Sequence, residues 1–368
     1  MATGFCPYLL QDISEVTKNA SPMYKIQPNG FTGMLLQAGS PGIIRNDSYN
    51  GHKKTVQIKY MQRATVAQTD TALSCDATLL NAYTEATVSV GNIRQYSFMV
   101  EDETMAAYCD SASSRVQAGS MPTGVASEVL SQVFNGANAI IHGVNRDVLG
   151  LLTWGKNVVT GLNTATTLNI SKDLAVQSLT SGVTQLLSDY KKNYLTNRPQ
   201  VVGQGLFLNF TLQQPFASPN IYGIDSKIAT GSFDFWNDSD FDTVIGTNQV
   251  GVFEPNSIQL VEYLKYQGFK AGVFGTDTFG TITLPMYTAT EVVPVKFDIQ
   301  LRYHACETTL TDAYTGQSFT AQKGWQVILS KNFGLFQIPA DAYRSEDAAR
   351  SVNGALRYAV TNTCDTCS

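Results

Sequence analysis

The chain has 368 residues, which is enough to bury a sizeable hydrophobic core and to form two subdomains. Charged residues make up only 15% of it, against roughly 25% in an average soluble protein, and small polar residues replace them. The net charge of −5 argues against sequence-specific nucleic-acid binding, which normally needs a clustered basic face. A surface with few charges costs little to desolvate, which favours protein–protein burial, although a secreted β-rich protein would have the same composition.

Residues 1–50 show little hydrophobic periodicity, because turns rich in glycine and proline interrupt them repeatedly. Phe5, Tyr8, Phe31 and Leu35 give this segment more apolar anchors than a disordered tail carries. We therefore expect an extended arm whose order comes from what it lies against. Because no basic segment precedes an apolar run and no apolar stretch is long enough, neither a signal peptide nor a membrane span is expected.

Two alternating segments follow at residues 53–66 and 84–100, and each has the period of two that is typical of a β-strand. The polar segment between them contains no tight-turn dipeptide, so we expect a long projecting hairpin. Most of the local positive charge lies here, at Lys53, Lys54, Lys59, Arg63 and Arg94. Such charges either contact nucleic acid or, more commonly, solvate and protect the edge of a sheet.

The clearest helix is predicted over residues 123–149, where one apolar stripe recurs at three- and four-residue steps from Val125 to Val144. Gly136 and Gly143 interrupt this helix, and each weakens it by roughly 1 kcal/mol relative to alanine. We expect these glycines to mark a close backbone approach or a bend.

A second helix is predicted over residues 171–195, because Ser171 is a good N-cap and Lys191 and Lys192 lie near the negative end of the helix dipole. Beyond Arg198 the chain reads mainly as strands in VVGQGLFLNF, GTNQVGVFEPNSIQLVEYLKY and KFDIQLRYHA. Together these elements predict an α+β fold class.

Histidines and cysteines offer few catalytic or metal-binding arrangements. The chain has only three histidines, so a multi-histidine metal centre is nearly excluded. His304 and Cys306 share one face of a predicted strand and form the candidate pair for nucleophilic catalysis. Cys364 and Cys367 form a lone C-x-x-C that supplies two of the four ligands that zinc needs, so free thiols or a disulfide are expected.

Four aspartates, at positions 234, 238, 240 and 242, lie in FDFWNDSDFDTV. Their spacing resembles the start of a calcium loop, but counted from Asp238 the sixth and twelfth positions are Thr243 and Gln249 instead of glycine and glutamate. We expect an acidic surface loop.

Gly203 and Gly205 lack the third glycine of a dinucleotide-binding loop and predict a turn.

Carbohydrate binding or glycoside hydrolysis is an alternative function that the sequence does not exclude. The three tryptophans, Trp154, Trp236 and Trp325, could line a sugar groove, although burial in a core is their usual fate. Paired carboxylates for glycoside hydrolysis also remain an alternative.

The order of arm, long hairpin, long helix and returning strands resembles the major capsid proteins of tailed bacteriophages, which share the Johnson fold. The strings GVFEPNSIQLVEY, GLFQIPADAY and NGALRYAVTN are similar to segments of such proteins. The resemblance implies five segments: an N-terminal arm (1–50), an E-loop hairpin (51–106), a P-domain with the spine helix and a second helix (107–199), an A-domain (200–290), and a P-domain return strand with the C-terminal segment (291–368).

This resemblance implies a structural protein and no enzyme, without cofactor or metal. The chain would self-assemble into hexamers and pentamers of an icosahedral shell that encloses phage double-stranded DNA without sequence-specific binding and without a membrane. Portal, scaffolding or decoration proteins are the expected partners, and the virion is the expected location after assembly in the host bacterial cytoplasm. Expected inter-subunit contacts are Lys53, Lys54, Arg63, Asp70, Cys75 and Arg94.

Two departures and three alternatives accompany the resemblance. No coiled-coil scaffolding segment precedes the arm, and no Lys–Asn pair for covalent cross-linking can be identified. The alternatives are a nanocompartment shell of the same fold with enzyme cargo, a β-rich carbohydrate-binding or hydrolytic protein, and a tail or other minor virion protein.

Overall fold

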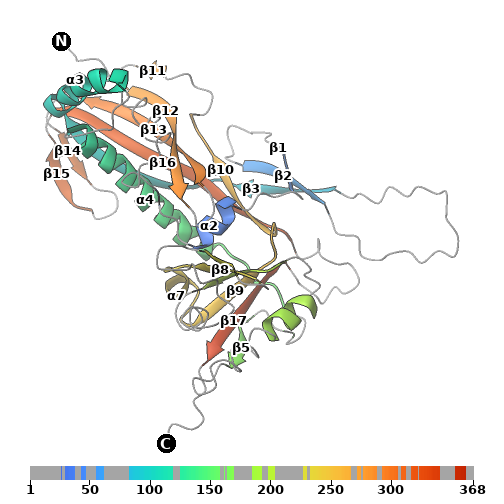
Figure 1. Cartoon of the computed structure of the whole chain (residues 1–368). Helices are drawn as coiled ribbons and strands as arrows, with labels where there is room; N and C mark the ends of the chain where they lie inside the picture. The colour runs from blue at the N-terminus through green and yellow to red at the C-terminus, as the bar shows by residue number, and fades with distance from the viewer. Residues whose placement is uncertain are drawn as a thin grey trace, which may run out of the picture. The chain divides into compact units, whose positions relative to one another are not determined.

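The computed structural model describes the following residues: 26, 30–37, 43–46, 55–61, 83–118, 125–157, 161, 164–169, 185–192, 198–203, 227–229, 233–266, 272–274, 277–287, 292–305, 308–311, 316–321, 323–339 and 353–361. They form an α+β structure (Figure 1). The helices are α2 (Gly30–Gln37), α3 (Asp102–Ala118), α4 (Val125–Gly150) and α7 (Phe241–Val244), and residues 185–192 are also helical. Among the described residues, no helix is both long and apolar enough to cross a membrane.

The strands of the first half are β1 (Ile43–Asn46), β2 (Thr55–Met61), β3 (Tyr83–Ser89), β4 (Asn92–Glu101), β5 (Thr166–Asn169), β6 (Gln200–Gly203), β7 (Lys227–Ala229) and β8 (Asp234–Asn237). Those of the second half are β9 (Gln249–Phe253), β10 (Ile258–Tyr263), β11 (Gly272–Phe274), β12 (Asp277–Tyr287), β13 (Val292–His304), β14 (Thr308–Thr311), β15 (Ser318–Ala321), β16 (Gly324–Gln337) and β17 (Ala355–Thr361).

The chain divides into two compact units, and each is discontinuous in sequence. The first unit consists of Met1–Pro28, Asn92–Val144 and Glu262–Asn332, and the second of Asn29–Gly91, Asn145–Val261 and Phe333–Ser368. Each unit therefore has to bring together segments that are far apart along the chain.

A sheet of long strands organises the first unit. Its strands β16, β13, β12 and β11 are neighbours in that order (Figure 1). Strand β4 also pairs with β16. Strands β12 and β13 are antiparallel and pair from Asp277↔Arg302 to Tyr287↔Val292. Every second residue of β13 from Val295 to Leu301 is buried and apolar, so this face supplies core.

Helix α4 packs against β4 in the first unit, and two glycines permit the close approach. A Cβ at position 136 would lie 2.8 Å from Cε1 of Tyr96, and one at position 143 would lie 3.2 Å from Cδ of Arg94. The hydroxyl of Tyr96 also donates to Oε1 of Gln132 at 3.3 Å. The close approach at these glycines is therefore made by side chains of β4, whereas a close approach of backbone or a bend was expected.

The second unit contains a mixed sheet of order β5-β17-β9-β6-β8-β7 and a smaller sheet of order β1-β2-β3. Strand β6 runs parallel to β8 and antiparallel to β9. Aromatic rings fill the core beside this sheet: Phe253 lies 5.4 Å from Phe31 and 5.7 Å from Trp154, between ring centroids.

Two predicted elements differ from the structure. Residues 1–50 are not an extended arm throughout, because residues 30–37 form helix α2, in which the expected anchors Phe31 and Leu35 are buried. Residues 84–100 are not one strand either. Strand β3 pairs with β2 and ends at Ser89, whereas β4 pairs with β16, because Val90 and Gly91 interrupt the run between two different partners.

The two predicted helices have different outcomes. The long helix is confirmed, since α4 spans Val125–Gly150 against the expected 123–149. Of the second predicted helix, residues 185–192 are helical, and positions 171–184 and 193–195 lie outside the described residues.

Candidate functional site

A cluster of buried, hydrogen-bonded polar residues lies where helix α2 begins, in the second unit. We call Phe31, Thr32, Asn145, Asp238 and Asp240 the cap cluster. The first N–H groups of any helix lack partners within that helix. Here the N–H of Phe31 donates to Oδ2 of Asp238 at 2.8 Å, and the N–H of Thr32 donates to Oδ1 of Asn145 at 3.0 Å. Residues 207 and 113 positions away along the chain therefore cap α2.

Asn145 connects the parts of the cap cluster. Its Oδ1 also accepts the hydroxyl of Thr32 at 2.7 Å. Its Nδ2 donates to Oδ1 of Asp238 and to Oδ2 of Asp240, both at 3.1 Å. The N–H of Asp240 donates to Oδ1 of Asp238 at 2.9 Å, which closes the turn between β8 and α7. Both polar atoms of the Asn145 amide are therefore used, and its side chain is fully buried.

Asp238 is the most constrained carboxyl group of the cluster. Burial of its side chain raises the pKa of Asp238, while hydrogen bonds from Phe31, Asp240 and Asn145 act in the opposite direction. The negative charge of Asp240 raises the pKa of Asp238 further. A carboxylate beside the positive end of α2 is favourable, and the cost is its removal from water.

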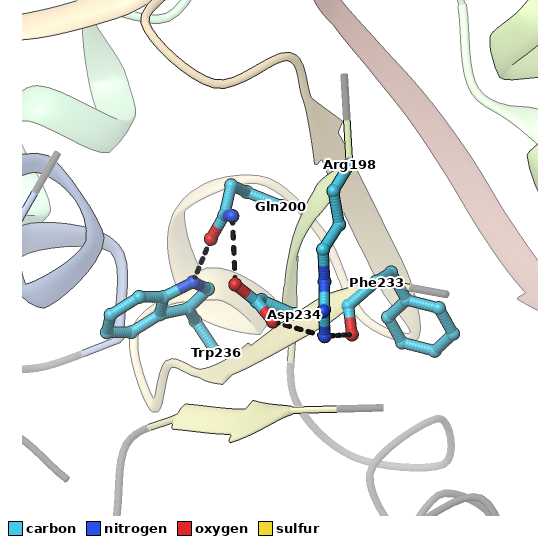
Figure 2. A network of polar contacts seen from close by, with 5 residues as sticks. All are labelled: Arg198, Gln200, Phe233, Asp234 and Trp236. Atoms are coloured by element: carbon cyan, nitrogen blue, oxygen red, sulfur yellow. Dashed lines mark hydrogen bonds and ion pairs between the residues drawn. The ribbon is translucent and has the colours of Figure 1, made fainter. Parts of the chain in front are cut away.

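A second polar network links β6 and β8 (Figure 2). The guanidinium of Arg198 pairs with Oδ1 of Asp234 at 2.7 Å. Gln200 donates to Oδ2 of the same carboxylate at 3.1 Å, and its Oε1 accepts the indole N–H of Trp236 at 2.6 Å. Side chains of two parallel neighbouring strands are thus tied together across the sheet.

These two networks correct the prediction of an acidic surface loop. Asp234, Asp238 and Asp240 are all buried, because each carboxylate accepts hydrogen bonds that the surrounding backbone and amides supply. In the sequence, the run of closely spaced aspartates is typical of a solvated loop. The fold shows that they accept hydrogen bonds as helix caps and across neighbouring strands.

The first unit has its own buried ion pair. Lys331 on β16 is fully buried, its Nζ lies 2.7 Å from Oε1 of Glu262, and it donates to the carbonyl of Lys296 at 2.9 Å. The same ammonium lies 5.1 Å from the ring centroid of Phe297. Because a buried charge is costly unless it is paired, these contacts explain how a lysine is accommodated inside the sheet.

The structure describes one member of the proposed catalytic pair and all three tryptophans. His304 hydrogen-bonds Oε1 of Gln326 at 3.1 Å, and Cys306, its proposed partner, lies outside the described residues. Trp236 and Trp325 are buried, and the rings of Trp325 and Tyr303 lie 5.0 Å apart. Trp154 stacks on Phe253. Trp236 and Trp325 are therefore core residues, whereas Trp154 is half-buried.

Cys109 on α3 is disulfide-bonded. The C-x-x-C pair, Cys364 and Cys367, lies outside the described residues. Within the described ranges, no group of three or more His, Cys, Asp or Glu residues could hold a metal ion.

Of the six expected inter-subunit contacts, Lys53, Lys54, Arg63, Asp70 and Cys75 lie outside the described residues. Arg94 lies on β4, is half-buried, and packs its side chain on Gly143 of the same chain. Its contact with another subunit stays a prediction.

Sequence reasoning missed Asn145 and Lys331. One signal was available for Asn145: it follows Ile141 by four positions, so it lies on the apolar stripe of α4, where a polar residue needs a partner. For Lys331 the strand pattern contained no such signal, because lysine is ordinary on the solvent face of a strand.

Comparisons with known proteins give matches among solved structures alone. No family model matches the chain, and no curated protein matches it. A structure titled "Cyanophage A-1(L) capsid asymmetric unit" is 9% identical, covers 97% of this chain and 94% of its own, and has a TM-score of 0.43. Structures from Mycobacterium phage Adephagia (8% identity, 99% and 92% coverage) and Mycobacterium phage Bobi (9%, 95% and 98%) have the same TM-score of 0.43. The chain is thus similar, over nearly its whole length, to phage structures that include a cyanophage capsid.

Proposed function

We propose that this chain is a structural protein, a phage major capsid protein with the Johnson fold. In this proposal, copies of the chain self-assemble into hexamers and pentamers of an icosahedral shell that encloses double-stranded DNA. The order of the described elements carries the proposal. The β2–β3 hairpin is followed by β4 and by the long helix α4, and then by the long paired strands β12, β13 and β16.

The five segments of the sequence resemblance take their places in this proposal. Residues 1–50 form the N-terminal arm, 51–106 the E-loop, 107–199 and 291–368 the P-domain with its C-terminal segment, and 200–290 the A-domain. Helix α4 then acts as the spine helix, and its packing on β4 through Gly136 and Gly143 makes it a stiff support. The connection between β2 and β3, with residues 67–82 as its expected tip, would lap over a neighbouring subunit.

Composition supports an assembled state. With only 15% charged residues, the subunit buries surface against its neighbours at little desolvation cost. Each contact contributes modestly, but a subunit that makes many of them is held by their combined effect. The net charge of −5 keeps a polyanion from binding tightly to the inner wall, which suits a container for DNA.

The partners follow from the same proposal. Portal, scaffolding or decoration proteins would complete the particle in the host bacterial cytoplasm, and the mature location would be the virion. Shell assembly needs no catalytic residue and no cofactor. Buried residues such as Asp238 and Lys331 would serve to hold the subunit in one conformation.

The direct test is negative-stain electron microscopy of the purified full chain, after size-exclusion chromatography with light scattering. Closed icosahedral particles or rings with five- and six-fold symmetry are expected. A monomer that persists when a crowding agent is added would overturn the proposal and favour the carbohydrate-binding or hydrolytic class. A glycan screen that reads shifts in melting temperature would then identify that class.

Cargo decides between a DNA container and a nanocompartment. Particles recovered from a natural host lysate are treated with nuclease and then opened. Protected double-stranded DNA is expected inside them. Particles that hold enzyme and no nucleic acid would contradict the DNA part of the proposal while leaving the shell part intact.

A further inference from the structure

The side chain of Arg357 lies at the end of an aromatic stack in the second unit. Arg357 on β17 is opposite Gly251 on β9. Because Gly251 has no side chain, two rings occupy its surroundings: a Cβ there would lie 2.8 Å from Cζ of Phe253 and 3.1 Å from Cζ of Phe241. Trp154 packs on both rings, at 5.7 Å and 6.5 Å between centroids. Cζ of Arg357 lies 5.6 Å from the centroid of Trp154, so a cation–π contact holds the guanidinium in place.

The guanidinium of Arg357 leaves its hydrogen-bond donors unused within the chain. A guanidinium carries five N–H groups and accepts no hydrogen bond. In the part of the chain that the structure describes, Arg357 forms neither a hydrogen bond nor an ion pair. Its Nε is buried without a partner, whereas its two terminal nitrogens are not buried, and the side chain as a whole is half-buried. The outer edge of the guanidinium, which presents two parallel N–H groups, is therefore open to a ligand.

A second cation lies near this edge. The N–H of Gly155 donates to the carbonyl of Ala355 at 2.9 Å, so the segment that contains Trp154 and Lys156 runs beside β17. Lys156 is half-buried and, among the described residues, forms no ion pair. The chain has 30 acidic and 25 basic side chains, so acidic partners exist within it, and these two cations use none of those that the structure describes.

The geometry favours a carboxylate as the ligand. The parallel N–H groups of a guanidinium match the two oxygens of a planar carboxylate, and stacking on an aromatic ring fixes their direction. Nucleic acid normally needs a clustered basic face, which Arg357 and Lys156 alone do not provide. Another copy of this chain supplies carboxylates in excess, since each copy has a net charge of −5. Charge complementarity therefore points to a second copy as the partner.

We propose that Arg357, held by Trp154 and assisted by Lys156, binds a carboxylate side chain of a second copy of this chain. This contact rests on the proposed function, because it needs copies that assemble. It adds to that function a specific inter-subunit site on β17.

A zero-length carbodiimide cross-linker tests the contact in the wild-type full chain. The reagent joins an amine to a carboxylate only when the two are in contact, so Lys156 reports on the partner of Arg357. Subunits labelled with ¹⁵N and unlabelled subunits, both treated with nuclease, are mixed before assembly and cross-linked. Mass spectrometry should find peptides in which Lys156 of one label is joined to Asp or Glu of the other. Cross-links of Lys156 within single chains only, or none at all, would overturn the proposal.

Two variants of Arg357 and one control complete the test. Arg357→Gln removes the charge and should raise the subunit concentration for half-maximal assembly by about tenfold or more, since charged hydrogen bonds are lost. Arg357→Lys keeps the charge without the parallel N–H groups and should have a smaller effect. Arg146 is exposed on α4, and Arg146→Gln should assemble like the wild type. Circular dichroism checks that each variant is folded, and light scattering measures assembly.

The outcomes separate this contact from the proposed function. If the wild type assembles and Arg357→Gln assembles equally well, the contact is wrong and the shell proposal stands. If Arg357→Gln and Arg146→Gln weaken assembly equally, the effect is one of general charge and the specific contact is wrong. A wild type that stays monomeric would overturn the proposed function, and the contact would fall with it.

Discussion

At the scale of single residues, the cap cluster shows how one amide can organise a junction. Asn145 satisfies a backbone N–H and a hydroxyl on α2 and also donates to two carboxylates. Each of those groups is buried, so each would lose a partner if the amide were removed. A buried polar atom without a partner costs about 1–3 kcal/mol.

Asn145→Ala should lower the free energy of unfolding by about 2–4 kcal/mol, because several buried groups lose their hydrogen bonds at once. Urea denaturation followed by circular dichroism measures the change. Asn135 is exposed on the same helix and is the matched control. Asn135→Ala should leave stability equal or slightly higher, since alanine favours helix. If both variants lost the same free energy of unfolding, the hydrogen bonds of the cap cluster would contribute no measurable stability.

At the scale of elements, the contact between α4 and β4 reverses the usual effect of glycine in a helix. Replacing a helical glycine with alanine normally stabilises by up to about 1 kcal/mol. At position 136 a Cβ would collide with the ring of Tyr96, whereas at position 150 it would meet nothing within 4 Å. The same substitution should therefore have opposite effects at the two positions.

Gly136→Ala is expected to destabilise the protein by about 1–2 kcal/mol through overpacking, and Gly150→Ala to be neutral or stabilising. Thermal melts of the two variants, compared with the wild type, measure both effects. A stabilised Gly136→Ala variant would mean that β4 does not lie close to α4 in solution.

The hairpin offers an element-scale test of the proposed assembly. Deletion of residues 67–82 shortens the connection between β2 and β3 and leaves both strands intact. We expect a soluble subunit with an unchanged circular dichroism spectrum that assembles poorly, because the tip can no longer lap over a neighbour. Light scattering and electron microscopy measure assembly. Normal particles from this variant would contradict the assignment of the E-loop.

At the scale of the whole molecule, buried carboxyl groups set the response to pH. Burial raises the pKa of Asp189, Asp238, Asp242 and Asp298 above the ordinary value, and in each case it is the largest cause. A raised pKa in the folded state means that the folded chain binds protons more tightly than the unfolded chain. The contribution to stability is therefore complete below about pH 4 and is lost as pH rises through the raised values.

We accordingly expect the contribution of these groups to the free energy of unfolding to decrease as the pH rises from mildly acidic to neutral. Urea denaturation at a series of pH values measures it. Asp298→Asn removes one of the four groups and should reduce the slope of stability against pH over this range, since asparagine does not titrate. A slope that stays the same or steepens in this variant would mean that the folded chain does not raise the pKa of Asp298.

The sequence by itself determined the α+β class, the position of the long helix to within a few residues, and the strands around Val201, Val252 and Phe297. These features are local, because periodicity acts through neighbouring residues. Only the tertiary structure decided that α2 interrupts the arm and that β3 and β4 are separate strands. It also decided that Asp238 and Asn145 form a buried cap. Such features depend on partners 113 and 207 positions away, and the sequence pattern around each residue contains no information about which distant group will satisfy it.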